Sequence, residues 1–387
     1  MNFKKSYELV NFYSLLTSLY SLLSLTSCID KTDVSYNLNS SVLTVEGQVS
    51  DTAPTIVNLT YSKTNGRSVY TETIKNARVE ILIGDGSKIS LIETNPGTYE
   101  TNSDFRGKIN QTYQLVFKLV NGTTYQSTVE KLIGVPEIKK IYHSFNPNGI
   151  LDGTGKRVLG ATFDVYVDFE DPADQKNFYL WKWQLFEKQG ICLTCEQGYL
   201  NSFTQKCVTT MNRSPTYDYE CNGNCWEILY SQDINILSDV FTNGKDVIGR
   251  KVAPIPYYSE QGCLVEIQQV GISSEAYQYY ALLRDQSQTT GTLTDTPPAT
   301  VVGNVTNTLN SRERVVGFFG AAATRSVRYW IDRSGYSDKG FKSSLLGHEV
   351  NLEPSTPPKP PLNEIRPPYF PCISGRYRSP SKPTGWK

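Results

Sequence analysis

The stretch TYQLVFKLVNGTTYQS, residues 112–127, indicates the type of fold most directly. Apolar and polar side chains alternate from Tyr113 to Leu119, which is the pattern of a strand with one buried face. Asn121-Gly122 favours a two-residue type I′ turn, and Thr124 then begins a second alternating run. We therefore expect an antiparallel hairpin here.

Short alternating runs also precede this hairpin. They include VLTVEGQVS, TIVNLTYS, ARVEILIGDGS and GTYET, and turn residues separate them. Several short strands at this spacing are typical of a β-sandwich. Gly97-Thr98-Tyr99 resembles the G-x-Y corner of transthyretin-like modules, which are binding or spacer units. We therefore predict a transthyretin- or immunoglobulin-like β-sandwich over residues 42–135.

Val135-Pro136 marks the predicted start of a second β-rich domain, residues 136–353. ATFDVYVDFEDPADQKNFYLWKWQLFEK predicts two strands joined by a polar loop, with Phe163, Val165 and Val167 on one face. In SSEAYQYYALLRDQSQ, apolar residues recur at i, i+4 and i+7, which predicts an amphipathic helix at about 274–288. RVVGFFGAAATRSVRYWID then returns to a strand pattern.

Residues 354–387 hold ten of the twenty prolines of the chain, so they cannot form an ordinary helix or a central strand. Aromatic residues lie among these prolines, including Tyr377 and Trp386. A free linker rarely carries so many aromatic side chains. We therefore expect an extended strap that packs on the rest of the protein.

The composition supports a mainly β protein, because 25 Tyr and 15 Phe are residues that favour strands. Acidic and basic side chains are equal in number, at 38 each. Loss of residues 1–27 would remove Lys4, Lys5 and Glu8, which leaves a net charge of about −1. A chain without a basic excess gives no reason to expect nucleic acid as a partner.

The first 27 residues have the order of a secretory signal, with Lys4 and Lys5 before an apolar stretch that is too short to span a bilayer. Leu25-Thr26-Ser27-Cys28 resembles the bacterial lipobox, in which the cysteine is acylated and becomes the first mature residue. We expect a cleaved signal peptide over 1–27, lipidation at Cys28 and a polar tether over 28–41.

Several stretches in order carry a resemblance to one family. They are VLTVEGQVSD, NARVEILIGDG, NPGTYET, TYQLVFKLVNGTTYQS, VDFEDPADQKNFYLWKW, SSEAYQYYALLRDQS, PPATVVGNVTN, RVVGFFGAA and CISGRYRSPSKPTGW. Over nearly the whole mature chain they are similar to the domain of unknown function 4249 family of Bacteroidetes lipoproteins. This resemblance implies an outer-membrane lipoprotein, often encoded near TonB-dependent transporters, and it implies no catalytic residues.

Seven cysteines follow Cys28, and five of them lie in an insertion at 190–226. They are Cys192, Cys195, Cys207, Cys221 and Cys225 in the insertion, and Cys263 and Cys372 beyond it. Such pairs could hold zinc through thiolates. An exported protein meets an oxidising compartment, however, where thiols normally form disulfides. We favour disulfides, with at least one cysteine left over and the connectivity open.

Four carboxylates crowd one loop: Asp168, Glu170, Asp171 and Asp174. Oxygen-rich loops can bind Ca²⁺, which makes these residues weak calcium candidates. No EF-hand signature surrounds them, so we favour a solvated hairpin loop.

Asp51-Thr52-Ala53 resembles the short O-glycosylation sequon of Bacteroidetes. This match makes Thr52 a candidate glycosylation site.

The only two histidines are His143 and His348, and neither lies in a G-x-S-x-G or H-E-x-x-H motif. We therefore expect both to be structural, and we assign no catalytic residue and no cofactor. A glycosidase with a carboxylate pair stays formally open, because the separation of two carboxylates in space cannot be seen in a sequence.

Two functions follow from these features. The favoured one is a non-catalytic binding or accessory lipoprotein at the outer membrane, on the cell surface or its periplasmic face, that works with a TonB-dependent transporter in nutrient capture. The alternative is a surface hydrolase acting on polysaccharide or protein, which aromatic richness and abundant carboxylates support.

Overall fold

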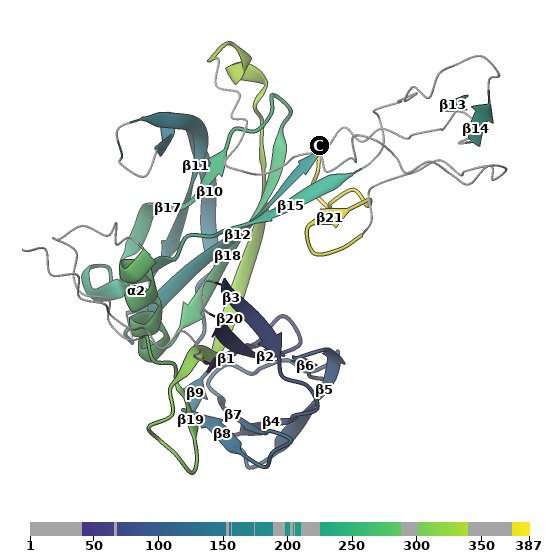
Figure 1. The fold of residues 1–387 in the computed structure, drawn as a ribbon. Helices are drawn as coiled ribbons and strands as arrows, with labels where there is room; N and C mark the ends of the chain where they lie inside the picture. The colour runs from purple at the N-terminus through teal and green to yellow at the C-terminus, as the bar shows by residue number, and fades with distance from the viewer. Residues whose placement is uncertain are drawn as a thin grey trace, which may run out of the picture. The chain divides into compact units, whose positions relative to one another are not determined.

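The computed structural model describes residues 41–65, 68–151, 155, 157–173, 175–188, 198–201, 204, 206–209, 225–287, 301–339 and 374–387. Strands dominate these residues, so the prediction of a mainly β protein is confirmed (Figure 1). Residues 41–63 and the described residues from 70 onward belong to one unit, to which the contacts below refer.

The first group of strands comes from the part of the chain that shows the short alternating runs. Its members are β1 (Ser41–Ser50), β2 (Ile56–Asn65), β3 (Ser68–Thr73), β4 (Arg78–Ile83), β5 (Lys88–Asn95), β6 (Thr98–Glu100), β7 (Thr112–Lys118), β8 (Thr124–Ser127) and β9 (Glu130–Lys131). Neighbouring strands follow the order β8-β7-β4-β5-β6-β2-β1. Most apolar residues of the alternating runs face inward, and Val45, Leu59, Leu115 and Phe117 are fully buried, whereas Ile56 and Leu82 are exposed.

The hairpin at 112–127 is confirmed, but its predicted type I′ turn is wrong. A type I′ turn needs positive φ at both central residues. Gly122 has φ +89°, whereas Asn121 is not among the residues with positive φ. The Leu119 N–H donates to the Thr123 carbonyl at 2.9 Å, and the Gly122 N–H donates to the Leu119 carbonyl at 2.9 Å. The loop therefore has three residues, a turn followed by a glycine bulge.

The second group of strands forms two sheets that pack face to face. Its members are β10 (Ile138–Leu151), β11 (Val158–Glu170), β12 (Phe178–Lys188), β15 (Trp226–Tyr230), β16 (Asn235–Ser238), β17 (Asp246–Pro256), β18 (Cys263–Ile272), β20 (Val315–Ile331) and β21 (Arg378–Ser379). The short strand β19 (Val305–Asn307) lies beside β8 of the first group. A separate pair consists of β13 (Gly198–Asn201) and β14 (Lys206–Thr209). One sheet has the order β10-β11-β17, and the other continues as β20-β18-β12-β15-β21.

The core between these two sheets comes from the alternation seen in the sequence. Phe163, Val165 and Val167 are fully buried on one face of β11, as predicted. Phe169 continues this face, and its ring lies 5.0 Å from that of Tyr179 on β12. Aromatic packing therefore holds the β11 sheet against the β12 sheet.

The predicted amphipathic helix is α2 (Ser274–Ser287). The Ala276 N–H donates to the Ser273 hydroxyl oxygen at 3.2 Å, so Ser273 caps the helix. Ala276 packs with Leu180 and Ile272 on the sheet face opposite to the β11 sheet. Among the described residues, no helix combines the length and the apolarity that crossing a membrane requires.

The long strand β20 belongs to both groups. Val315–Ala322 pairs in parallel with Leu43–Ser50 of β1, and Ala323–Ile331 pairs antiparallel with β18. Strand β19 also pairs with β8. Hydrogen-bonded strands thus join the chain on both sides of residue 135, where the sequence suggests a domain boundary.

A close approach of backbone segments accompanies the start of β20. Gly317 has φ +98°, and a Cβ atom there would lie 1.9 Å from the Val45 carbonyl oxygen. The Asn304 side chain bonds the same strand on its other side, because its Oδ1 accepts from the Phe319 N–H at 2.9 Å and its Nδ2 donates to the Phe319 carbonyl at 2.8 Å. The amide of Asn304 therefore replaces a pair of strand-to-strand bonds.

Residues 374–387 pack against the second group of strands. Trp386 lies between Trp226 and Trp330, with ring centroids 5.9 Å and 5.0 Å away. The Ile228 N–H donates to the Tyr377 carbonyl at 2.8 Å. The end of the chain thus covers part of the sheet face that α2 leaves open.

Candidate binding recess

A recess of about 340 Å³ opens between the two packed sheets, at the edge where β12 passes β17. Two tryptophans and several charged side chains share its lining. The lining residues are Trp181, Trp183, Asp233, Ile234, Asn235, Ile236, Arg250, Lys251, Val252, Pro254 and Arg284.

A break in strand pairing exposes the tryptophan side of the recess. β12 pairs with β15 over residues 184–188 and with β16 over 178–181, which leaves 182–183 between the two ladders. The Ser231 N–H donates to the Trp183 carbonyl at 2.9 Å, so the chain bulges here. Trp183 is half-buried as a result.

Trp181 forms the rigid floor, because it is almost completely buried. Its indole N–H donates to Gln269 Oε1 at 3.0 Å, which fixes the ring. The Arg250 guanidinium lies over this ring at 5.0 Å from the centroid, a cation–π contact. Trp181 therefore positions a positive charge at the recess.

The partners of Arg250 among the described residues are neutral oxygens. Its Nη2 donates to Asn235 Oδ1 at 2.5 Å and to the Ile236 carbonyl at 3.1 Å. Its Nε is enclosed without a hydrogen-bond partner in this part of the protein. Burial lowers the pKa of Arg250, but an arginine stays protonated at any physiological pH.

The remaining charges differ in how firmly they are paired. Lys251 Nζ lies 2.6 Å from Asp164 Oδ2, and the Asp164 side chain is 6% exposed. Arg284 contacts its neighbour Asp285 at 3.0 Å, and the Asp285 side chain is 63% exposed. Asp233 is the one carboxylate in the lining, against three basic side chains. The recess lining is therefore aromatic, and its basic side chains outnumber its carboxylate.

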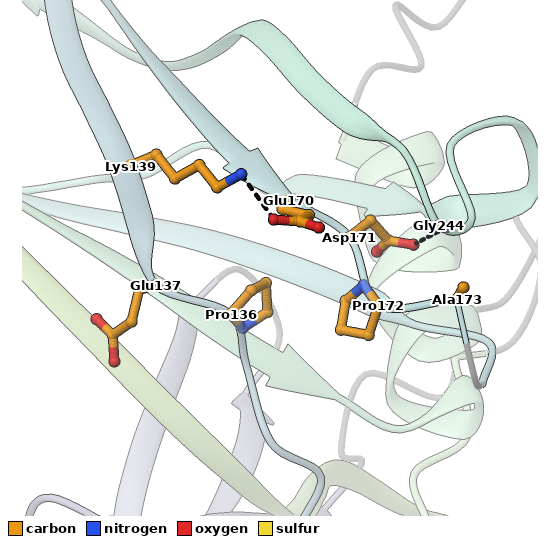
Figure 2. A pocket seen from close by; sticks show the side chains of 8 residues that line it. All are labelled: Pro136, Glu137, Lys139, Glu170, Asp171, Pro172, Ala173 and Gly244. Carbon is orange, nitrogen blue, oxygen red and sulfur yellow. Dashed lines mark hydrogen bonds and ion pairs between the residues drawn. The ribbon is translucent and has the colours of Figure 1, made fainter.

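A second cavity, of about 460 Å³, lies at the acidic loop after β11. Figure 2 shows Lys139 reaching toward Glu170, and the Nζ to Oε2 distance is 2.7 Å. Glu137 Oε1 lies 2.5 Å from Arg325 Nε. Asp171 accepts from the Tyr179 hydroxyl and from the Gly244 N–H at 3.2 Å. Each of these carboxylates already binds a protein group. Their bonds therefore stabilise the loop, and the carboxylates are not free to bind a ligand.

The three described calcium candidates do not converge. Asp168 accepts from the Gly249 N–H at 2.8 Å, Glu170 pairs with Lys139, and Asp171 is buried against Tyr179. Among the residues that the structure describes, no three acidic, histidine or cysteine side chains could hold a metal ion. Protein donors already occupy these carboxylates. Asp174 lies outside the described residues.

Most cysteine candidates lie outside the described residues, namely Cys28, Cys192, Cys195, Cys221 and Cys372. Nothing is described of the Cys207 side chain. Cys225 is fully buried next to β15. Cys263 is not in a bridge: its thiol is free and fully buried, and burial raises its pKa. Cys225 is disulfide-bonded, whereas the pairing of the remaining cysteines stays a prediction.

Thr52, the candidate glycosylation site, is exposed just after β1. Its hydroxyl oxygen lies 3.0 Å from that of Ser50. Asp51 is turned the other way, where its carboxylate accepts from the Thr324 N–H at 2.8 Å and from Arg325 at 3.0 Å. Glycosylation stays a prediction.

His143 makes stability depend on pH. Its Nδ1 lies 2.8 Å from the Tyr329 hydroxyl, and burial lowers its pKa while Asp332 opposes this. With a lowered folded-state pKa, its contribution is full above the unfolded pKa of about 6.5 and is lost as pH falls through the folded value. His143→Gln should therefore reduce the loss of unfolding free energy between about pH 7.5 and 5, measured by urea denaturation. Equal losses in both proteins would contradict this.

The described strands form a mainly β fold, and the recess on it is small and aromatic. The model of the family described as Domain of unknown function (DUF4249) matches residues 30–328. The chain belongs to this family, as its motifs suggest. No curated protein matches it.

None of the sequence motifs points to Trp183, Arg250 or Arg284. A partial signal was present, because strict alternation in NFYLWKW places Trp181 and Trp183 on one face of a strand. The pairing break that half-exposes Trp183 has no sequence signature.

Proposed function

We propose that the protein is an outer-membrane-anchored lipoprotein that binds a small ligand and serves as a non-catalytic accessory subunit of a TonB-dependent transporter in nutrient capture. The recess at Trp183 carries this proposal. It has the size of a small-molecule site, which is about 300–1,000 Å³. It combines aromatic walls with a few fixed polar groups, as such sites do.

The side chains in the recess are suited to holding a ligand. Trp181 and Arg250 are fixed by packing and hydrogen bonds, so little conformational entropy is lost when a ligand binds. A glycosidase would use two facing carboxylates. The recess lining offers Asp233 alone, which favours binding over the hydrolase alternative.

The proposed lipid at Cys28 would supply the contact with the transporter. A tethered protein meets a partner in the same membrane at a high effective concentration, so the interface need not be tight. The tether at 28–41 would leave the recess free to turn toward the transporter.

The test uses the full chain in its native membrane. Purification in mild detergent should recover a TonB-dependent transporter, and deletion of the lipoprotein should lower uptake by that transporter. Trp183→Ala should lower uptake in the same way while the protein stays in the membrane, because an aromatic anchor at a binding site is typically worth about 2 kcal/mol or more.

Two variants serve as controls. Tyr70→Ala removes an aromatic side chain that is 46% exposed on β3 and should leave uptake unchanged. Cys28→Ala should release the protein from the membrane or leave it unprocessed, and it should abolish uptake enhancement with the recess intact. If no transporter is recovered and deletion leaves uptake unchanged, the accessory function is wrong.

A further inference from the structure

We infer that the recess binds a small organic anion whose charged group is attached to a ring. This inference rests on the proposed binding function and adds the chemical class of the ligand. The ring would contact Trp183, and the anionic group would face Arg250 and Arg284.

Arg250 has no acidic partner among the described residues, which is the first support for an anionic ligand. Arg250 is half-buried, and even a partly buried charge is costly unless a counter-charge or good hydrogen bonds compensate it. The described partners of Arg250 are an amide oxygen and a carbonyl oxygen, both neutral. The cation–π contact with the buried Trp181 holds the guanidinium of Arg250 in place. An anionic ligand would supply the counter-charge that these partners lack.

Arg284 is only weakly paired, which is the second support for an anionic ligand. Its partner Asp285 is the next residue on α2 and is largely exposed. An exposed ion pair contributes little, because water and salt screen it. Arg284 can therefore exchange this partner for a ligand anion at small cost. Lys251 is less available, because it pairs with the nearly buried Asp164.

The size of the recess and the exposed part of Trp183 indicate the shape of the ligand. A volume of about 340 Å³ lies near the lower end for ligand sites, so it favours a single ring over a long chain. Trp183 is half-buried, and a ring face can pack against its exposed part. A charged saccharide unit and a charged aromatic compound share this chemistry.

Binding of matched probes to the purified, lipid-free full-length mature chain tests the inference by calorimetry and tryptophan fluorescence. The saccharide pair is glucuronate and glucose, and the aromatic pair is N-acetylphenylalanine and its amide. At least one anion should bind about tenfold or more tightly than its neutral partner, as charge-assisted hydrogen bonds predict. The pair that responds identifies the source of the ring.

Arg284→Gln should remove most of this preference, because it removes one of the two arginines that would face the anionic group. Arg284 is partly exposed, so its loss should not disturb folding. Arg78→Gln removes an exposed arginine on β4 and should change nothing. Higher salt should weaken anion binding in the unmodified protein.

The outcomes separate the two proposals. If anion and neutral partner bind equally, or if Arg284→Gln keeps the preference, the inference of an anionic ligand is wrong. If none of the four probes binds, it is wrong as well. The transporter and uptake experiments with Trp183→Ala would still decide the proposed function independently.

Discussion

Arg333→Met is expected to lower the free energy of unfolding by about 3–5 kcal/mol. Arg333 is fully buried, and its guanidinium binds both carboxylate oxygens of Glu187, at 2.7 Å and 3.1 Å. Burial raises the pKa of Glu187, and Arg333 opposes this. Loss of the arginine would leave a buried carboxylate without its counter-charge. Urea denaturation at about pH 8 measures the effect.

The pH dependence and a double variant check the cause. Without Arg333 the pKa of Glu187 should rise further, so the deficit should shrink as pH falls and the carboxylate becomes protonated. Arg333→Met combined with Glu187→Leu should recover much of the loss, because a buried ion pair can be replaced by apolar packing. Lys139→Gln, in an exposed pair, is the control and should change little. A deficit in Arg333→Met as small as that of the control would refute this account.

Gly317→Ala is expected to cost about 2–5 kcal/mol of unfolding free energy. A left-handed backbone conformation costs an alanine roughly 1–2 kcal/mol, and overpacking typically adds about 1–3 kcal/mol. Gly317 has φ +98°, and the atom that a Cβ would meet is the carbonyl oxygen of Val45. A backbone atom in a paired strand cannot move aside easily. Chemical denaturation of the purified variant measures the cost.

Gly86→Ala separates the two contributions. Gly86 has a similar φ of +87°, but a Cβ there would meet nothing within 4 Å. This variant should therefore show the backbone cost alone, about 1–2 kcal/mol. If both variants lose the same stability, the close approach at Gly317 contributes nothing.

Local patterns were enough to predict much of the fold. Alternation identified the hairpin at 112–127 and the buried face of β11, and apolar spacing placed α2 to within a residue or two. The turn type was wrong because Asn-Gly is compatible with more than one loop, and the sequence does not show how many residues the loop holds.

The candidate site depended on contacts between distant residues. Arg250 meets Trp181 across two sheets, and Arg284 reaches the recess from α2. The partners of the acidic loop were equally hidden from the sequence. Its carboxylates are close in sequence, but the protein donors that bind them, such as Tyr179 and the Gly249 amide, come from other strands.

Strand β20 constrains the order in which the strands can pair, because the partner of β1 lies near the other end of the described chain. Its bonds to the first group of strands include one from the Thr324 amide to Asp51, 273 positions earlier. Contacts of such long sequence separation form slowly, because a large loop must close first. As the chain folds, the edge of β1 stays open until residues 315–322 are available to pair with it. An exposed strand edge is prone to aggregation over such an interval. A chaperone that protects this edge should therefore raise the yield of the folded protein.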